Sequence, residues 1–200
     1  MGAVPTSTPE RFAGREAPPV PRGGARRLLF DMLARLPLSG LHRIADVLAP
    51  MGQHVIRYRR DVVLANLARA FPALPERERR RLAGAFYRNI ADVGAECMRV
   101  ATIDANELGE RVSLLNPELL DPFVRAGQSI VLLGSHEANW EWVFLACCSR
   151  LPFAVDAVYK PLRDSAIDDF MRRARARFGA VLLKPEDAAQ GLAAGRGRLR

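Results

Sequence analysis

The centre of this chain contains the segment Ile130-Val-Leu-Leu-Gly-Ser-His-Glu-Ala-Asn-Trp-Glu141. The apolar run at residues 129–133 predicts a buried strand, and the Gly-Ser pair after it predicts a turn into a helix that begins at Glu137 or Asn139. Ligands of open α/β sheets bind beyond the carboxyl ends of the strands, which is where this pattern puts His136. The segment therefore predicts an α/β fold with a candidate site at the turn.

Strand-like and helical segments alternate on both sides of this turn, from residue 106 onward. We expect strands at residues 111–115, 129–133, 153–159 and 180–183. We expect helices at residues 117–126, 139–149 and 165–178, the last of them stopped by Gly179. Alternation of this kind is typical of right-handed β-α-β units, so the predicted fold is α/β with a mostly parallel sheet.

Residues 26–105 carry a helical pattern with little strand signal. Apolar residues recur every three or four positions in two stripes: Leu41, Ile44, Leu48, Met51 and Val55, then Leu82, Phe86, Ile90, Val93, Cys97 and Val100. The first stripe predicts an amphipathic helix kinked at Pro50. Two interpretations of its apolar face are open: it packs into the protein core, or it lies in a membrane interface beside the arginine-rich segment 57–60.

The composition is apolar enough for a core and strongly basic, with 49% hydrophobic residues and a formal net charge of +8. Only Lys160 and Lys184 among the basic residues are lysines, and arginine suits phosphate and carboxylate binding without identifying a partner. The cysteine pattern fits neither a disulfide framework nor a zinc motif. Charges and prolines interrupt the apolar N-terminal segments, so none predicts a membrane-spanning helix. We expect a disordered leader at 1–25, a helical membrane-associating region at 26–105 and an α/β domain at 106–200.

His136 is the candidate catalytic residue. A neutral imidazole at this turn can accept a proton from an attacking hydroxyl group, and a carboxylate on its other ring nitrogen would fix the tautomer. Glu141, five residues on, can supply that carboxylate. The alternative is that His136 has a structural role and takes no part in catalysis. Trp140 stands where a zinc hydrolase needs its second histidine, and Ser135 lacks the flanking glycines of a serine hydrolase, so the sequence disfavours both mechanisms.

His136 and Glu141 form an H-x4-E motif that resembles the H-x4-D/E motif of the bacterial lipid A late acyltransferases, the lauroyl- and myristoyl-transferase type. Three further blocks occur in the order of that family: Leu33-Ala-Arg-Leu-Pro-Leu38, Asn66-Leu-Ala-Arg-Ala-Phe-Pro72, and Val158-Tyr-Lys-Pro-Leu162 leading to Arg175-Ala-Arg-Phe-Gly179. The resemblance covers residues 28–187. It implies N-terminal amphipathic helices followed by a mostly parallel sheet with flanking helices, of the glycerolipid acyltransferase type.

The resemblance implies an enzyme that moves a fatty acyl chain from an acyl carrier protein thioester to a hydroxyl of a lipid A precursor or related glycolipid. In such an enzyme His136 is the general base and Glu141 is its orienting partner. The hydroxyl attacks the thioester directly, so no acyl-enzyme, metal or cofactor is expected. The candidate substrate-binding residues are Asn139, Lys160, Arg163 and Arg175. Lys160 stands where the family often has arginine, and with Arg163 it is the candidate for binding phosphate or stabilising the oxyanion.

The resemblance also implies a place at the cytoplasmic face of the inner membrane, in peripheral or monotopic form, on a surface with anionic lipid. Nucleic acid is not an expected partner, because no groove-reading motif accompanies the positive charge. The family continues beyond the position of Arg200 with further strands and an Asp-Gln motif, so we expect the C-terminal part of the sheet to be missing. Two alternatives are an acyltransferase acting on lysophospholipid or another glycolipid, and a catalytically inactive membrane-binding fragment.

Overall fold

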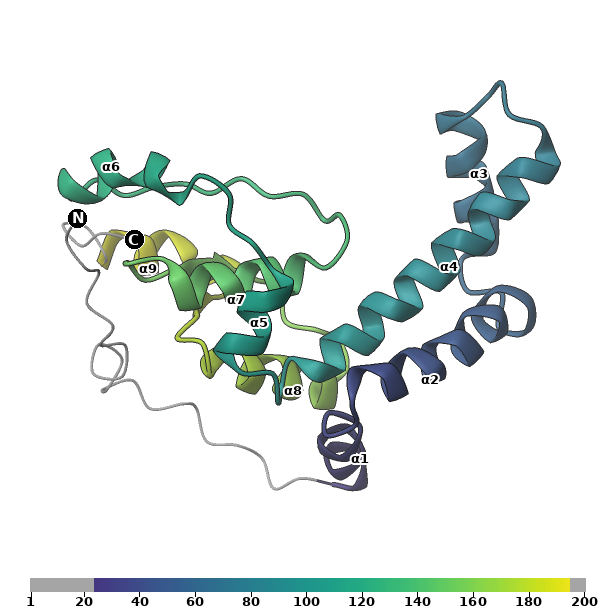
Figure 1. Ribbon diagram of the computed structural model, residues 1–200, viewed down its shortest axis with the longest axis horizontal. Helices are drawn as coiled ribbons and strands as arrows, with labels where there is room; N and C mark the ends of the chain where they lie inside the picture. The colour runs from purple at the N-terminus through teal and green to yellow at the C-terminus, as the bar shows by residue number, and fades with distance from the viewer. Residues whose placement is uncertain (1–23, 195–200) are drawn as a thin grey trace.

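The computed structural model describes residues 24–194, so the predicted leader at 1–25, apart from its last two residues, and residues 195–200 lie outside the described part. In chain order the elements are α1 (Ala25–Leu33), α2 (Leu38–Pro50), the π-helical turn η2 (Met51–Val55), α3 (Arg60–Ala70), α4 (Glu76–Arg99), α5 (Ala105–Arg111), η3 (Pro117–Leu120), α6 (Asp121–Arg125), α7 (Trp140–Arg150), β1 (Asp156–Val158), α8 (Ser165–Ala176), β2 (Val181–Leu183), η4 (Pro185–Asp187) and α9 (Ala188–Ala194). Figure 1 shows α2, α3 and α4 as a helical arm that extends away from a body containing α5 and α7–α9.

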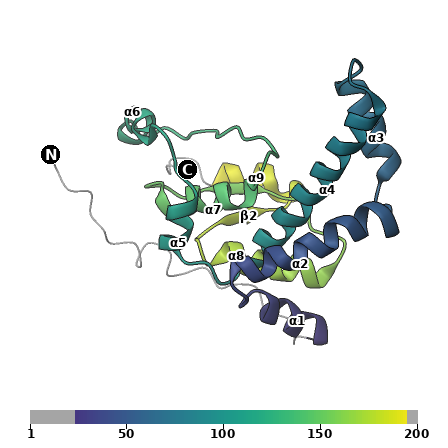
Figure 2. The same ribbon diagram turned by 45° about the vertical axis from the view of Figure 1, so that its right-hand side comes forward.

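The body is of the α/β class, as predicted, with a small parallel sheet. β1 and β2 pair in parallel with Ala157 opposite Leu182, and α8 connects them. Asp164 caps α8 because its side chain accepts hydrogen bonds from the backbone N–H groups of Ala166 and Ile167. Gly179 follows α8 with a φ of 73°, the left-handed conformation that favours glycine after a helix. Figure 2 shows β2 between α7 and α8.

The main hydrophobic core joins the end of α4 to α5, α7 and α8. Its buried members are Val100, Ile103, Leu108, Trp142, Leu145, Ala146, Cys148, Ala174 and Phe178. Ile103 and Leu145 are fully buried, so the turn after α4 and the middle of α7 are fixed against each other. This packing determines where the first turn of α7, which follows the His136 segment, lies relative to α4 and α8.

The helical arm confirms both predicted amphipathic helices, and its described contacts bury only part of each apolar stripe. α2 lies against α4 through a buried cluster of Leu41, Ala45 and Ala95. Most of the larger apolar residues of both stripes are exposed instead: Ile44, Leu48, Met51, Val55, Leu82, Phe86 and Ile90. The predicted break at Pro50 is present, since the α-helix ends there and η2 begins. The arm therefore leaves much of its apolar surface uncovered by the described residues.

Two predicted strands are absent from the described part of the chain. Residues 105–111 form α5, which overlaps the strand expected at 111–115. The run at 129–133 is irregular, with Val131 and Leu133 exposed by 85% and 95%. A strand needs a neighbour to pair its backbone groups, and the small sheet of residues 24–194 consists of β1 and β2 alone. The strand predicted at residues 129–133 from their apolar composition is therefore wrong for the described part of the chain.

Candidate functional site

A buried ion pair lies at the start of α7. Arg175, on α8, donates a hydrogen bond from Nε to Oε1 of Glu141 at 2.7 Å and another from Nη2 to Oε2 at 2.8 Å. The Glu141 side chain is 4% exposed and the Arg175 side chain 18%. Two parallel bonds between a guanidinium and a carboxylate form a strong, geometrically specific contact. The pair therefore fixes the first turn of α7 against α8.

The charge of Glu141 affects the pKa values of two neighbouring side chains, Arg175 and Cys97. Burial lowers the pKa of Arg175, but the hydrogen bonds and the charge of Glu141 outweigh burial and hold that pKa above its ordinary value. Burial raises the pKa of the Cys97 thiol to about 12, and the charges of Glu141 and Glu96 add to the effect. A thiol with so high a pKa is a poor nucleophile, so Cys97 does not offer a covalent route for acyl transfer.

Asn139 links the start of α7 to α4. Its side-chain oxygen accepts a hydrogen bond from the backbone N–H of Trp142 at 3.0 Å, which is the expected N-cap interaction. Its Nδ2 donates to Oε2 of Glu96 on α4 at 2.6 Å. The indole Nε1 of Trp142 donates to the backbone carbonyl of Glu96 at 3.2 Å. Asn139 thus serves as a cap and an interhelical link, and its role in substrate binding stays a prediction.

Glu96, on α4, is a further polar residue of the site that the sequence pattern does not single out. Besides accepting from Asn139, its Oε1 lies 3.6 Å from Nε2 of His42 on α2, a ring nitrogen that is buried without a hydrogen bond in the described residues. One signal pointed to it: Glu96 is an acidic residue directly beside Cys97 on the apolar stripe of α4. An acidic side chain at the margin of a buried stripe requires a polar partner, and the periodicity alone does not identify that partner.

His136 lies in the exposed turn that precedes α7. Its ring centroid is 5.1 Å from that of Trp140, so the imidazole rests against an aromatic neighbour. Within residues 24–194 no hydrogen bond or ion pair involves the His136 side chain. The ring nitrogens are therefore open to an incoming hydroxyl group.

The structure brings Glu141 together with Arg175, and no hydrogen bond in the described part of the chain joins Glu141 to His136. Each carboxylate oxygen has two lone pairs, so a bidentate contact to arginine leaves acceptor capacity unused. The pairing of His136 with Glu141 stays a prediction.

Lys160 and Arg163 follow the carboxyl end of β1, in the loop that leads to α8, and both are exposed. This is the edge of a parallel sheet at which ligands bind in α/β folds. Tyr159, at the start of the same loop, places its ring 5.8 Å from the guanidinium carbon of Arg175. The loop therefore connects the predicted anion-binding residues to the buried Glu141–Arg175 pair.

Among the described residues, no group of three or more His, Cys, Asp or Glu side chains is placed to hold a metal ion.

The model of the family described as Bacterial lipid A biosynthesis acyltransferase matches residues 27–195 of the chain. The comparison with curated proteins finds no significant match. The family match spans the helical arm, the His136 turn and the β1–α8–β2 unit together.

Proposed function

Because the chain belongs to the bacterial lipid A biosynthesis acyltransferase family, we propose that it transfers a fatty acyl chain from an acyl carrier protein thioester to a hydroxyl of a lipid A precursor. Membership of the family implies acyl transfer in lipid A biosynthesis in general. The observation that carries the proposal is the exposed His136 imidazole in the turn before α7, which rests against Trp140 and has no hydrogen bond or ion pair among residues 24–194.

In the proposed reaction His136 acts as the general base. Its neutral imidazole accepts the proton of the acceptor hydroxyl as the oxygen attacks the thioester carbonyl. A carbon–oxygen bond forms, the carbon–sulfur bond breaks, and the proton passes from the imidazolium to the departing thiolate. Lys160 and Arg163 stabilise the negative charge of the carbonyl oxygen or bind a phosphate of the acceptor. Glu141 orients the imidazole, and Arg175 holds Glu141 in place.

We propose further that the helical arm associates with the cytoplasmic face of the inner membrane. Its exposed apolar residues, of which Val55 is 77% exposed, lie next to the basic segment 57–60. Apolar side chains beside arginines suit the boundary between acyl chains and anionic headgroups. Within residues 24–194, no helix combines the length and the apolar character needed to cross a bilayer. The exposed apolar side chains beside the basic segment support binding in the plane of the interface as the proposed form of association.

The proposal is tested by mass spectrometry of the lipid products. The chain is mixed with acyl carrier protein thioesters and a tetra-acylated lipid A precursor, in parallel with lysophospholipid as an alternative acceptor. The wild type should add one acyl chain to the precursor, and His136→Ala should add none. His54→Ala is the matched control, because His54 is also exposed and lies in η2 of the helical arm. Circular dichroism confirms that both variants are folded.

Each result has a distinct meaning. Equal product from His136→Ala and the wild type would refute the general base. If only lysophospholipid gains an acyl chain, lysophospholipid is the acceptor and the lipid A precursor is not. If no acceptor gains an acyl chain, the proposed activity of this chain is refuted. The membrane proposal is tested by sedimentation with anionic vesicles. Val55→Glu should weaken binding more than Leu115→Glu, which changes an exposed apolar residue outside the arm; the exposed fractions are 77% and 84%.

A further inference from the structure

A pocket of about 340 Å³ lies between α1, the turn after α4, and α8. Arg35, Arg173 and Arg177 line it, together with a single acidic residue, Asp31. Arg175 is two residues from both Arg173 and Arg177, which is about 200° around the helix, so it faces the other side of α8. The pocket is therefore separate from the Glu141–Arg175 pair of the candidate acyltransferase site.

The three arginines differ in how firmly they are held. Arg177 donates from Nη1 to the carbonyl oxygen of Val100 at 3.1 Å and from Nη2 to that of Ile103 at 3.0 Å. Arg173 donates to Asp169 at 3.1 Å and forms an ion pair with Asp31 at 3.4 Å. Two guanidinium groups are thus fixed by the protein itself.

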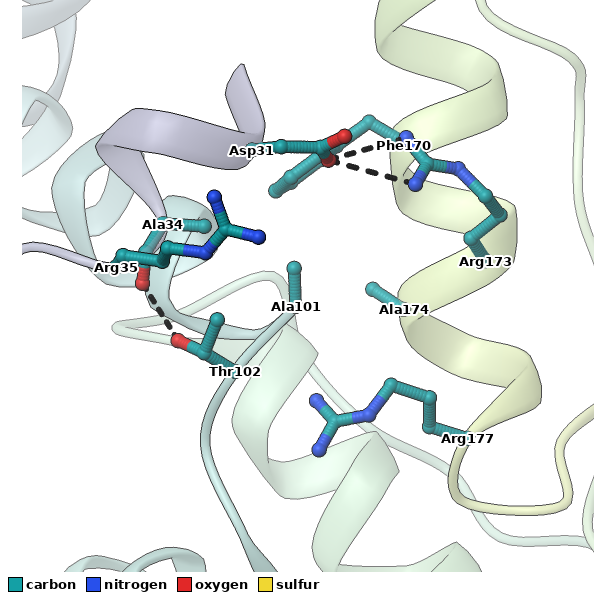
Figure 3. Close-up of a pocket in the computed structure, with 9 residues that line it drawn as sticks. All are labelled: Asp31, Ala34, Arg35, Ala101, Thr102, Phe170, Arg173, Ala174 and Arg177. Atoms are coloured by element: carbon teal, nitrogen blue, oxygen red, sulfur yellow. Dashed lines mark hydrogen bonds and ion pairs between the residues drawn. The ribbon is translucent and has the colours of Figure 1, made fainter. Parts of the chain in front are cut away.

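Arg35 is the third arginine of the pocket. Within residues 24–194 its guanidinium has no hydrogen bond or ion pair. Figure 3 shows it above Ala101 in this view, with the guanidinium of Arg177, directly after α8, below Ala101. Asp31 and Asp169 offset two of the three positive charges, so the charge of Arg35 remains without a counter-charge among the described residues. Positive charges gathered over low-dielectric walls repel one another and attract an anion.

The floor of the pocket is apolar. Ala34, Phe170 and Ala174 contribute to it, and Phe170 packs its ring against Phe30 of α1 at 5.8 Å between centroids. Guanidinium groups bind phosphate oxygens in pairs, and an apolar floor accommodates the carbon atoms attached to the phosphate. The geometry points to a phosphate-binding pocket, formed by Arg35, Arg173 and Arg177, for a phosphomonoester or for the phosphate of a lipid headgroup. This inference does not depend on the proposed acyl transfer.

Binding is tested by isothermal titration calorimetry with glycerol 3-phosphate at constant ionic strength. Arg35→Ala should weaken binding roughly tenfold, the loss expected for a charge-assisted hydrogen bond, and it should leave the fold intact because the side chain has no partner in the described residues. Arg43→Ala is the matched control, since Arg43 is an exposed arginine of α2 outside the pocket. A second arm measures sedimentation with phosphatidate and phosphatidylcholine vesicles.

The two arms separate the sources of phosphate. Binding of glycerol 3-phosphate that depends on Arg35 identifies a soluble phosphomonoester as sufficient. Preference for phosphatidate vesicles that depends on Arg35, without binding of the soluble compound, identifies a lipid headgroup. The inference is overturned if neither probe depends on Arg35, or if Arg43→Ala reduces binding as much as Arg35→Ala. None of these readouts requires acyl transfer, so failure here leaves the proposed function unaffected.

Discussion

Replacing Arg175 with methionine should destabilise the folded chain by about 3–5 kcal/mol, the cost of leaving one partner of a buried ion pair without the other. Methionine keeps much of the aliphatic length of arginine, so the change removes charge and two hydrogen bonds more than packing volume. The Glu141 carboxylate would then lie 4% exposed without its guanidinium. That carboxylate must either stay charged in the core or take up a proton, and both are unfavourable at neutral pH.

Glu141→Gln should cost less, about 1–3 kcal/mol, since the amide oxygen still accepts one hydrogen bond from Arg175. The Arg175 side chain is also 18% exposed, so its charge retains some contact with water. The double variant Glu141→Gln/Arg175→Met should be more stable than Arg175→Met alone, because it leaves no buried charge. A gain in stability from the second substitution would show that the unpaired charge of Glu141 destabilises Arg175→Met, because a loss of packing alone would not be reversed by Glu141→Gln.

The assay is urea unfolding followed by circular dichroism at pH 7. The control is Arg80→Met, which removes an ion pair of similar length to Glu76, at 2.6 Å, between side chains that are 61% and 69% exposed. That substitution should leave the urea midpoint nearly unchanged, because exposed ion pairs contribute little. The reasoning is refuted if Arg175→Met shifts the midpoint no more than Arg80→Met does, or if the double variant is less stable than Arg175→Met.

Three further changes test other parts of the structure. Burial raises the pKa of Cys97 and Cys148 to about 12, above the range near 8.5 where free thiols titrate, so the unfolded chain releases these protons first. The free energy of unfolding should therefore fall as pH rises from about 9 towards 12, and Cys97→Ala/Cys148→Ala should flatten that fall in urea titrations at successive pH values. Asn139→Asp should destabilise the chain in thermal melts although aspartate is a good N-cap, because its carboxylate would face the Glu96 carboxylate; equal melting temperatures would contradict this. Gly179→Ala should cost about 1 kcal/mol in urea unfolding, since alanine is disfavoured at a φ of 73°.

The predictions that the structure confirms rest on local signals. The helix at residues 165–178 was expected from its apolar stripe, its acidic cap and Gly179, and α8 shows this cap and this glycine conformation. The start of a helix at Asn139 was one of two expected boundaries, and its side chain caps α7. The strands at 153–159 and 180–183 contain β1 and β2. Caps, breakers and short apolar runs act within a few residues, so the sequence alone reveals them.

The errors arose where a local pattern depends on distant partners. Residues 129–133 have the composition of a buried strand, but they lack a paired neighbour in the described part of the chain and are exposed. The apolar stripe of α2 correctly predicted a helix, but its periodicity does not show which of its residues pack against α4. The buried cluster between α2 and α4 contains Leu41 of the stripe together with Ala45 and Ala95, whereas Ile44 and Leu48 of the same stripe are exposed.

The sequence by itself determined the family motif, the α/β class and the helices with clear ends, because each depends on residue type and spacing along the chain. Only the tertiary structure decided that Glu141 pairs with Arg175, that Glu96 holds Asn139, and which arginines share a pocket. The residues of the first pair are 34 positions apart on different helices. Which of the many charged side chains meet is set by how helices pack through their apolar faces, and that packing is a property of the whole fold.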